Sequence, residues 1–211
     1  MKRILCYGDS NTWGWSPITR ERYDDRTRWT RVLASDLGAE YEVIEEGLNG
    51  RTTVWDDPLE GDGRNGFSYL LPCLETHRPL DLVIIMLGTN DLKKRFSLTA
   101  SDIALGAAVL VKAVQQSAAG REAKAPPVLL LAPPPVGRLT EFAEEFEEAT
   151  EKSKKLGDRY RQVAHELGCA LLDTSTVILS SDVDGIHFDP EEHAKLGHAM
   201  DGIIQKILMP A

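Results

Sequence analysis

The sequence has no excess of positive charge, which argues against partners that carry many phosphate groups. Its 24 Lys and Arg residues are outnumbered by 33 Asp and Glu residues, which gives a net charge of −9. Proteins that bind nucleic acid or anionic membranes need a basic surface to neutralise phosphate groups. We therefore expect neither nucleic acid nor a membrane among the partners.

Long hydrophobic runs and a disulfide framework are also missing. No apolar run approaches the length that spans a bilayer, and the apolar run near the start stops at Gly8 and Asp9, too early for the core of a signal peptide. The sequence has only three cysteines, an odd number: Cys6, Cys73 and Cys169. Cys6 and Cys169 fall in expected strands. We expect all three to be reduced, in a cytoplasmic protein.

Short apolar runs that are typical of strands alternate with helical patterns along the whole chain. The 211 residues, 42% of them hydrophobic, suit one domain over residues 1–211. The alternation predicts an α/β fold of three layers (α/β/α) around a central, mostly parallel sheet. Five strands are expected, at residues 3–7, 41–45, 82–87, 128–132 and 169–173. The expected helices cover 27–37, 65–76, 101–116 capped by Ser101 and Asp102, 140–167 either continuous or broken near 152–156, and a last one from Pro190. Because Pro72 falls inside the second of these, that helix is either kinked at Pro72 or starts there.

The end of the first expected strand carries the candidate nucleophile. Gly8 ends the strand in a turn, and Ser10 follows at the carboxyl edge of the sheet, where open α/β sheets bind their ligands. The alternative is an ordinary polar turn, since Asp, Ser and Asn are common turn and helix-capping residues.

The loop at residues 182–189 supplies a base for Ser10. Asp184 lies three residues before His187, so its carboxylate can turn back and accept the Nδ1–H of the imidazole. The Nε2 atom of His187 is then free to take a proton from Ser10. The other four histidines follow a helix end or lie in helical patterns, which predicts solvated or satisfied core side chains (His77, His165, His193 and His198).

A serine that attacks a carbonyl also needs hydrogen-bond donors for the oxyanion that forms. The candidates are the backbone N–H groups of Ser10 and Gly50 and the side-chain amide of Asn90. Two of these residues have a plainer interpretation: Gly50 could be an ordinary turn glycine, and the side chain of Asn90 could cap a turn. Asp9 and Asp91 are expected to bond backbone amides of their own turns.

Four segments, at residues 8–10, 50, 88–91 and 184–187, resemble in order and spacing the four blocks of the SGNH (GDSL-type) hydrolases. The longer segments 8–15, 45–53, 87–91 and 184–188 look like the bacterial arylesterase/acyltransferase branch. The resemblance covers nearly the whole chain. It implies the flavodoxin-like SGNH hydrolase fold with a five-stranded sheet.

The resemblance also implies an activity, that of a serine esterase for short-chain, acetyl-like carboxylic and aryl esters with an acyl-Ser10 intermediate. Ser10, Asp184 and His187 would be the catalytic residues, and no metal or organic cofactor would be needed. Some members of this branch transfer acyl groups to alcohols or peroxide even in water. Because such members can have alanine at the position of Gly50, the preference for acyl transfer is not carried over intact to this chain. Members form ring-like octamers, which implies a homo-oligomer here.

The substrate pocket is expected to involve residues beside the four blocks. Trp13, Trp15, Lys93 and Ile186 are candidates, although either tryptophan could instead anchor the core. Phe146 lies four residues after Phe142, a spacing typical of an amphipathic helix. By resemblance, Phe146 could reach the active-site entrance of a neighbouring subunit.

Three other functions remain open from the sequence. A carbohydrate O-deacetylase or a small thioesterase could use the same fold and the same serine. A metal-dependent phosphoesterase would use oxygen and nitrogen ligands and leave Ser10 and Gly50 without a role; its ligands would be Asp9, Asn90, Asp91, Asp184 and His187. A binding module with a decayed site is the third.

Overall fold

The central element is a five-stranded sheet whose neighbouring strands all run parallel. The structure, a computed structural model, describes residues 1–208. The strand order is β2 (Tyr41–Gly47), β1 (Lys2–Gly8), β3 (Leu82–Met86), β4 (Val128–Ala132) and β5 (Ala170–Asp173). This arrangement confirms the predicted α/β class and the predicted strands. Because the order reverses between β1 and β3, their carboxyl ends form the crevice where doubly wound folds bind ligands.

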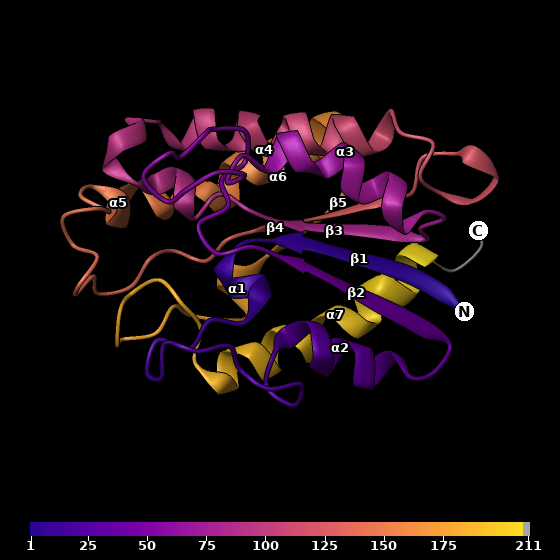
Figure 1. Cartoon of the computed structure of the whole chain (residues 1–211), viewed down its shortest axis with the longest axis horizontal. Coiled ribbons are helices and arrows are strands. Elements are labelled where there is room, and N and C mark those ends of the chain that lie inside the picture. The colour runs from indigo at the N-terminus through magenta and orange to yellow at the C-terminus, as the bar shows by residue number, and fades with distance from the viewer. Residues whose placement is uncertain (209–211) are drawn as a thin grey trace.

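Helices cover both faces of the sheet, as Figure 1 shows. On one face lie α3 (Gly66–His77), α4 (Ala100–Gln115) and α6 (Leu156–Leu167); on the other lie α2 (Trp29–Leu37) and α7 (Pro190–Leu208). The shorter elements are α1 (Ser10–Trp13), α5 (Ala149–Ser153) and the 3₁₀ turns η1 (Asn90–Leu92), η2 (Lys94–Phe96), η3 (Arg121–Ala123) and η4 (Thr174–Thr176). The described residues contain no helix both long and apolar enough to cross a membrane.

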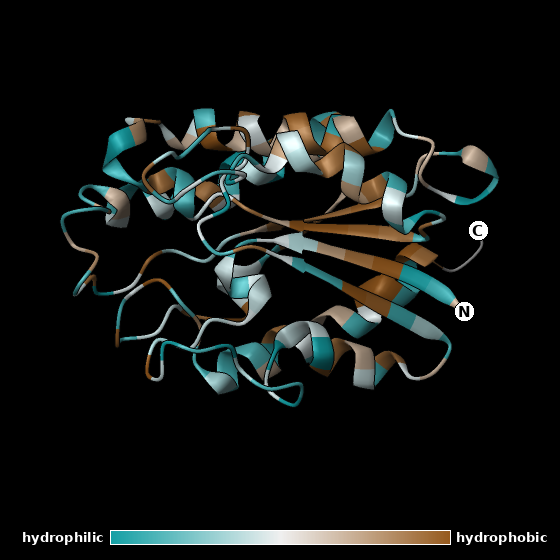
Figure 2. Ribbon diagram, in the orientation of Figure 1, coloured by the Kyte–Doolittle hydropathy of each residue, from teal (hydrophilic) through white to brown (hydrophobic). Residues whose placement is uncertain are grey.

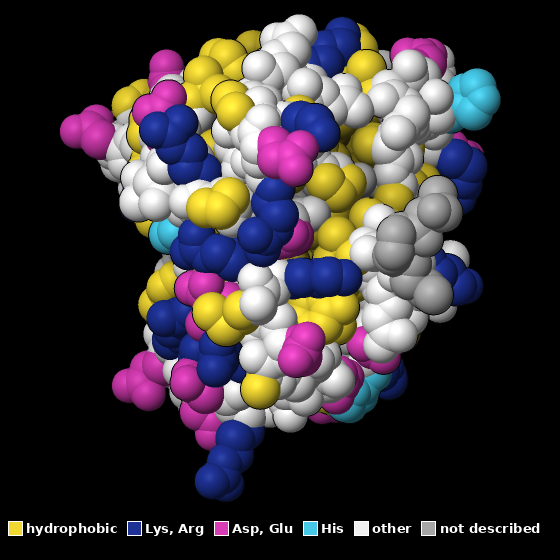
Figure 3. All heavy atoms as spheres, turned by 90° about the vertical axis from the view of Figure 1, so that its right-hand side faces the viewer, with side chains coloured by type: hydrophobic (Ala, Val, Ile, Leu, Met, Phe, Trp, Pro, Cys, Tyr) yellow, Lys and Arg dark blue, Asp and Glu magenta, His cyan; other side chains and the backbone are white. Residues whose placement is uncertain are grey.

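Side chains of the strands alternate between two hydrophobic cores. On β1, Leu5 and Tyr7 pack in the core beneath α3, α4 and α6, whereas Ile4 and Cys6 pack in the core beneath α2 and α7. β3 and β4 are apolar at every position and buried throughout, as expected for central parallel strands. In Figure 2 β3 and β4 are therefore brown along their length, whereas β1 and β2 are brown in the middle and teal or white towards their ends. On the face at the amino ends of the strands, basic and acidic side chains lie interspersed (Figure 3).

The predicted helix over 140–167 is wrong in its first third. Residues 140–148 form turns, and Glu148 has a left-handed backbone (φ 68°) immediately before α5. One glutamate of this segment, Glu145, is partly buried because it pairs with Lys93 and Arg95 of a neighbouring segment, while the other glutamates face solvent. The backbone of Glu145 is held as well, because the N–H of Lys94 donates to its carbonyl at 2.8 Å.

One predicted helix start needs correction, and the structure decides between the two alternatives given for another. α4 is capped by Thr99, whose side chain accepts from the N–H of Asp102 while the Asp102 carboxylate accepts from Thr99, so Ser101 lies inside the helix. α3 begins well before Pro72, because the side chain of Asn65 caps it. The proline lies within the helix.

Candidate active site

Three side chains from the two ends of the chain form a hydrogen-bonded line at the carboxyl edge of the sheet. Ser10 is the first residue of α1, directly after β1, and its Oγ lies 3.0 Å from Nε2 of His187. The Nδ1 atom of His187 lies 2.6 Å from Oδ2 of Asp184. All three residues are buried, with 6%, 7% and 1% of Ser10, His187 and Asp184 exposed. This is the geometry in which a carboxylate orients an imidazole that removes a hydroxyl proton.

The loop that carries Asp184 and His187 is held in a tight turn. Oδ1 of Asp184 accepts the backbone N–H groups of Ile186 at 2.8 Å and His187 at 2.9 Å. Gly185 between them has a left-handed backbone with φ 80°. A Cβ there would lie 2.7 Å from the carbonyl of Arg138, so this turn requires glycine.

The charge of Asp184 is favoured in this position. Burial opposes ionisation, but the hydrogen bond and the charge of His187 outweigh it, so the pKa of Asp184 lies below its usual value. The imidazole of His187 is itself enclosed by aromatic rings, with centroids at 5.9 Å for Trp15 and 6.1 Å for Phe142. The pair is thus shielded from water except towards Ser10.

Donors for an oxyanion lie beside Ser10. Within residues 1–208, no protein acceptor bonds the backbone N–H of Ser10 or of Gly50, and both residues line the same pocket as Asn90. Nδ2 of Asn90 gives one hydrogen to the carbonyl of Arg51 at 3.1 Å, which leaves its second hydrogen available. The structure thus brings together the three donors that the sequence suggested.

Arg51 is a residue that the sequence reasoning missed. It is only 2% exposed, and its guanidinium donates to the carbonyls of Gly8 at 2.9 Å and Glu46 at 2.5 Å. The same group lies 4.2 Å from the ring centroid of Tyr7. Arg51 therefore joins the ends of β1 and β2. The position next to Gly50 was the only signal in the sequence.

Asp9 and Asp91 have structural partners. Asp9 caps its own turn as expected, because Oδ1 accepts the N–H of Asn11 at 2.9 Å. The carboxylate of Asp91 accepts the N–H and the hydroxyl of Thr53, a partner outside its own turn that the sequence did not indicate. Burial raises the pKa of Asp9 to about 7 and that of Asp91 to about 6. With Asp184 also occupied by His187, these carboxylates are a poor set of ligands for a catalytic metal.

A pocket of about 290 Å³ opens at Ser10 and His187. Of the expected lining residues it includes Trp15, Lys93, Phe146 and Ile186. Sequence reasoning did not place Asn49, Glu60, Phe142 and Glu145 there, although they complete the lining.

Trp13 lies outside this lining, contrary to expectation. Gly14 follows it with φ 92° and turns the chain before Trp15 enters the pocket. The Trp13 ring packs against Trp15 with centroids 6.1 Å apart and under the guanidinium of Arg22 at 5.3 Å. Trp13 therefore packs against Trp15 outside the pocket lining.

One wall of the pocket is ionic. The side chain of Lys93 is 3% exposed, and its ammonium group lies 2.8 Å from Glu60, 3.3 Å from Glu145 and 3.4 Å from Asp57. Arg95 binds Asp57 at 2.9 Å. These pairs connect three separate loops around the entrance, and they leave polar oxygens of Glu60 and Glu145 at the rim.

The remaining histidines have other partners. His193 is fully buried, its Nδ1 accepts the N–H of Trp29 at 3.3 Å, and burial lowers its pKa to about 3. His198 pairs with Asp36, and His165 is exposed. None of them reaches Ser10 in the described part of the chain.

Comparison with known proteins identifies relatives over almost the full length. The chain is 47% identical to the aryl esterase of M. smegmatis, with 99% of this chain and 100% of that chain covered and a TM-score of 0.94. It is 40% identical to a carbohydrate acetylesterase from Sinorhizobium meliloti, with 98% and 100% covered and the same TM-score of 0.94. A lipolytic protein of the G-D-S-L family from Veillonella parvula, 11% identical with a TM-score of 0.69, shares the fold. No curated protein matches the sequence.

The family model described as "GDSL-like Lipase/Acylhydrolase family" matches residues 6–195, which include Ser10 and His187. The resemblance inferred from the four segments is thereby confirmed. The chain belongs to the GDSL-like lipase/acylhydrolase family.

Proposed function

We propose that the chain is a serine esterase that hydrolyses short-chain, acetyl-like carboxylic and aryl esters through an acyl-Ser10 intermediate. The observation that carries the proposal is the hydrogen-bonded line Ser10–His187–Asp184, which ends in a pocket with the oxyanion donors beside it. The aryl esterase and the carbohydrate acetylesterase among the similar structures support ester hydrolysis.

In the first step Ser10 Oγ attacks the ester carbonyl while Nε2 of His187 takes its proton. Asp184 holds the Nδ1–H and stabilises the imidazolium that forms. The negative oxygen of the tetrahedral intermediate is bound by the N–H groups of Ser10 and Gly50 and the amide of Asn90. When the C–O bond of the ester breaks, His187 returns the proton to the leaving alcohol.

In the second step water releases the acyl group by the reverse sequence. His187 removes a proton from water, the hydroxide adds to the acyl carbonyl, and Ser10 leaves with the proton that His187 returns. Neither step requires a metal ion or an organic cofactor.

The shape of the pocket favours small acyl groups. Trp15, Phe142 and Ile186 surround His187, and the buried Lys93 closes the side next to Asn90. We expect p-nitrophenyl acetate to have a higher kcat/KM than p-nitrophenyl octanoate. A faster octanoate would overturn the acyl-size proposal and leave the esterase proposal intact.

Hydrolysis of p-nitrophenyl acetate by the wild type and by Ser10→Ala, each with EDTA present, tests the esterase proposal. Removal of such a nucleophile lowers kcat by about 10⁶-fold. Ser68→Ala, an exposed serine on α3, is the matched control and should retain full activity. Activity that survives in Ser10→Ala, or that EDTA abolishes in the wild type, contradicts the proposal.

Carbohydrate O-deacetylation is the second candidate. The ionic wall of the pocket favours it, because oxygens of Glu60 and Glu145 can accept hydrogen bonds from sugar hydroxyl groups. The carbohydrate acetylesterase from Sinorhizobium meliloti supports the same substrate class. A higher kcat/KM for acetylated xylose than for phenyl acetate would favour deacetylation over aryl ester hydrolysis.

We propose acyl transfer to alcohols and perhydrolysis as secondary activities. Both require that an alcohol or peroxide compete with water for the acyl enzyme near Gly50. Gly50 has φ 75°, and a Cβ at this position would lie 3.1 Å from Glu60. The ratio of ester exchange to hydrolysis in water with added benzyl alcohol measures this competition.

We also propose that the chain is one domain that forms a homo-oligomer, an octamer by family resemblance, in the cytoplasm. Large apolar side chains on the outer sides of α3 and α4 support association, since Phe67, Leu71 and Leu105 are 40%, 44% and 61% exposed. The free thiols of Cys6, Cys73 and Cys169 suit a reducing compartment. Light scattering on the purified chain gives the mass of the particle.

A further inference from the structure

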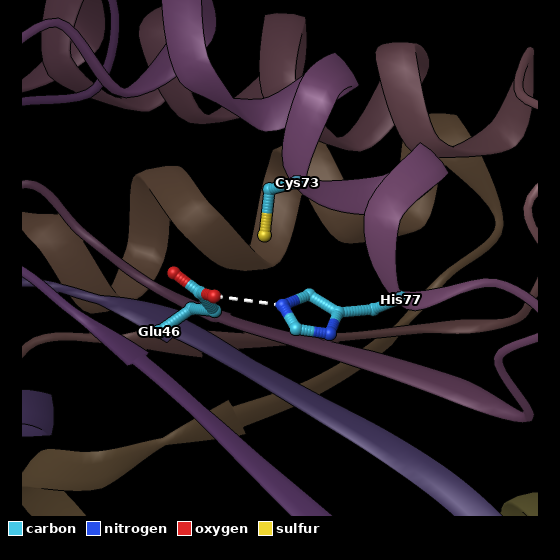
Figure 4. A group of neighbouring side chains, drawn as sticks. All are labelled: Glu46, Cys73 and His77. Carbon is cyan, nitrogen blue, oxygen red and sulfur yellow. Dashed lines mark hydrogen bonds and ion pairs between the residues drawn. The ribbon is translucent and has the colours of Figure 1, made fainter.

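A cluster of three potential metal ligands lies away from the active-site pocket. Glu46 is on the edge strand β2, and Cys73 and His77 are on α3. One ligand atom from each, the carboxylate oxygen, the thiol sulfur and an imidazole nitrogen, lie within 4.8 Å of one another. Figure 4 shows the sulfur of Cys73 pointing from the helix towards the gap between the other two side chains, which are joined by a hydrogen bond.

We propose that Glu46, Cys73 and His77 form a binding site for a zinc ion that joins the edge strand β2 to helix α3. Water would complete a tetrahedral set of one sulfur, one nitrogen and one oxygen ligand from the protein. This set has the composition that zinc prefers.

The helix prepares two of the ligands. Cys73 and His77 are four residues apart, so their side chains lie on the same side of α3, one turn apart. In a tetrahedral zinc site, neighbouring ligand atoms are roughly 3.5 Å apart, because the metal–ligand bonds are about 2.0–2.3 Å long. The three atoms here, within 4.8 Å, need to move together by about 1 Å, which rotation of the Glu46 and His77 side chains can supply.

Burial and access also fit a bound ion. Cys73 is fully buried, while the side chains of His77 and Glu46 are 22% and 20% exposed, so an ion can reach the cluster from the side of these two partly buried residues. The hydrogen bond of 2.7 Å between His77 Nε2 and Glu46 Oε1 shows that these atoms already point at each other. Both can exchange that bond for bonds to a metal ion.

The charges balance when zinc binds. Burial raises the pKa of the Cys73 thiol to about 12, with Glu46 adding to the effect and Arg51 opposing it. Zinc displaces the thiol proton into solvent and forms the Zn–S bond, so one thiolate and one carboxylate neutralise the doubly charged ion. The complex thereby removes the negative charge of Glu46 from a partly buried site.

Occupancy would strengthen a part of the fold that leads to the active site. Glu46 is the penultimate residue of β2, and its carbonyl accepts from Arg51, whose own carbonyl holds Asn90. Fixing Glu46 against α3 would therefore stabilise the loop that carries Gly50. Zinc should raise the melting temperature of the protein without taking part in the reaction at Ser10.

Titration of the metal-free full chain with Zn²⁺, in competition with a chromophoric chelator, tests the proposal. We expect one ion per chain, and affinity at least about 10-fold weaker in Cys73→Ala and in His77→Gln. Mg²⁺ and Ca²⁺ should not compete, because both avoid sulfur and nitrogen ligands. The matched controls are Cys169→Ala and His198→Gln, the latter from a second histidine–carboxylate pair with Asp36.

Cobalt gives a readout that does not depend on any variant folding. Co²⁺ bound by the wild type should show the near-ultraviolet charge-transfer band of a cobalt–thiolate bond, and Zn²⁺ should abolish that band. The proposal is overturned if no ion binds, if the cobalt spectrum shows no thiolate, or if the control variants lose affinity as Cys73→Ala does. Because none of these readouts uses ester hydrolysis, their failure leaves the esterase proposal standing.

Discussion

The substitution Asp184→Asn removes one negative charge from the proposed triad while preserving the shape of the side chain. In the wild type Oδ1 accepts two backbone N–H groups, those of Ile186 and His187, and Oδ2 faces Nδ1 of His187. Asparagine has one acceptor oxygen and one NH₂ donor. Its oxygen must stay against the two backbone donors, so the NH₂ group faces Nδ1.

This arrangement gives His187 the wrong tautomer. Nδ1 becomes the acceptor and Nε2 carries the hydrogen, so Nε2 donates to Ser10 across the 3.0 Å contact and cannot take its proton. The imidazolium would also lose its neighbouring carboxylate. The corresponding change in a serine protease lowers kcat by about 10⁴-fold. That factor corresponds to about 5 kcal/mol of the activation barrier, and we expect a similar loss here.

The assay is the steady-state hydrolysis of p-nitrophenyl acetate over a range of pH, with the circular dichroism spectrum as a check of folding. Asp182→Asn is the matched control, because this exposed residue lies in the same loop and the substitution changes the net charge equally. A kcat of Asp184→Asn within tenfold of the wild type would refute the role of Asp184. An equal loss in Asp182→Asn would show that the loop, and not the tautomer, is responsible.

Three further substitutions give results of different kinds. Asn90→Ala should lower kcat by about 10²–10³-fold with little change of KM in the same assay, and an unchanged kcat would remove Asn90 from the oxyanion site. Gly185→Ala should destabilise the fold by at least about 1–2 kcal/mol in urea unfolding, because a Cβ would strike the Arg138 carbonyl at a left-handed position; wild-type stability would contradict this. Asp9→Asn should raise the melting temperature at about pH 8 but not at about pH 4. Burial raises the pKa of Asp9 from about 3.9 in the unfolded chain to about 7 in the folded protein. Between these two pKa values the folded state binds more protons than the unfolded state, so the stability of the wild type falls as the pH rises towards 7. A gain of Asp9→Asn over the wild type that is larger at about pH 4 than at about pH 8 would contradict this reasoning.

The strands were predictable because their apolar runs leave few alternatives. Residues 82–86 and 128–132 contain only apolar side chains, which matches burial on both faces, and the structure buries every one of them. The ends of these strands also indicated the location of the site, since ligand-binding residues gather at the carboxyl edge of a parallel sheet. Ser10 and His187 are 177 residues apart; Ser10 could be assigned to that edge from the strand before it, and His187 was paired with Ser10 because Asp184 lies three residues before it.

The segment 140–148 was not predictable in the same way. Its glutamates and its Phe142–Phe146 spacing are typical of an amphipathic helix, and propensity alone favours that interpretation. Tertiary contacts override it, because the buried Lys93 and the partly buried Arg95 need carboxylates and draw Glu145 inwards. Both phenylalanines then become walls of the pocket.

Arg51 shows why the site has to be understood as a unit. Its guanidinium is bonded to the carbonyls that end β1 and β2, its own carbonyl holds Asn90, and it follows Gly50 directly. A buried cation is costly to desolvate, and joining several segments in one register is a role that can offset this cost. Here those segments carry all three proposed oxyanion donors, so Arg51 fixes their separation. No spacing in the sequence expresses this role, because it depends on three strand ends that meet only after the sheet has formed.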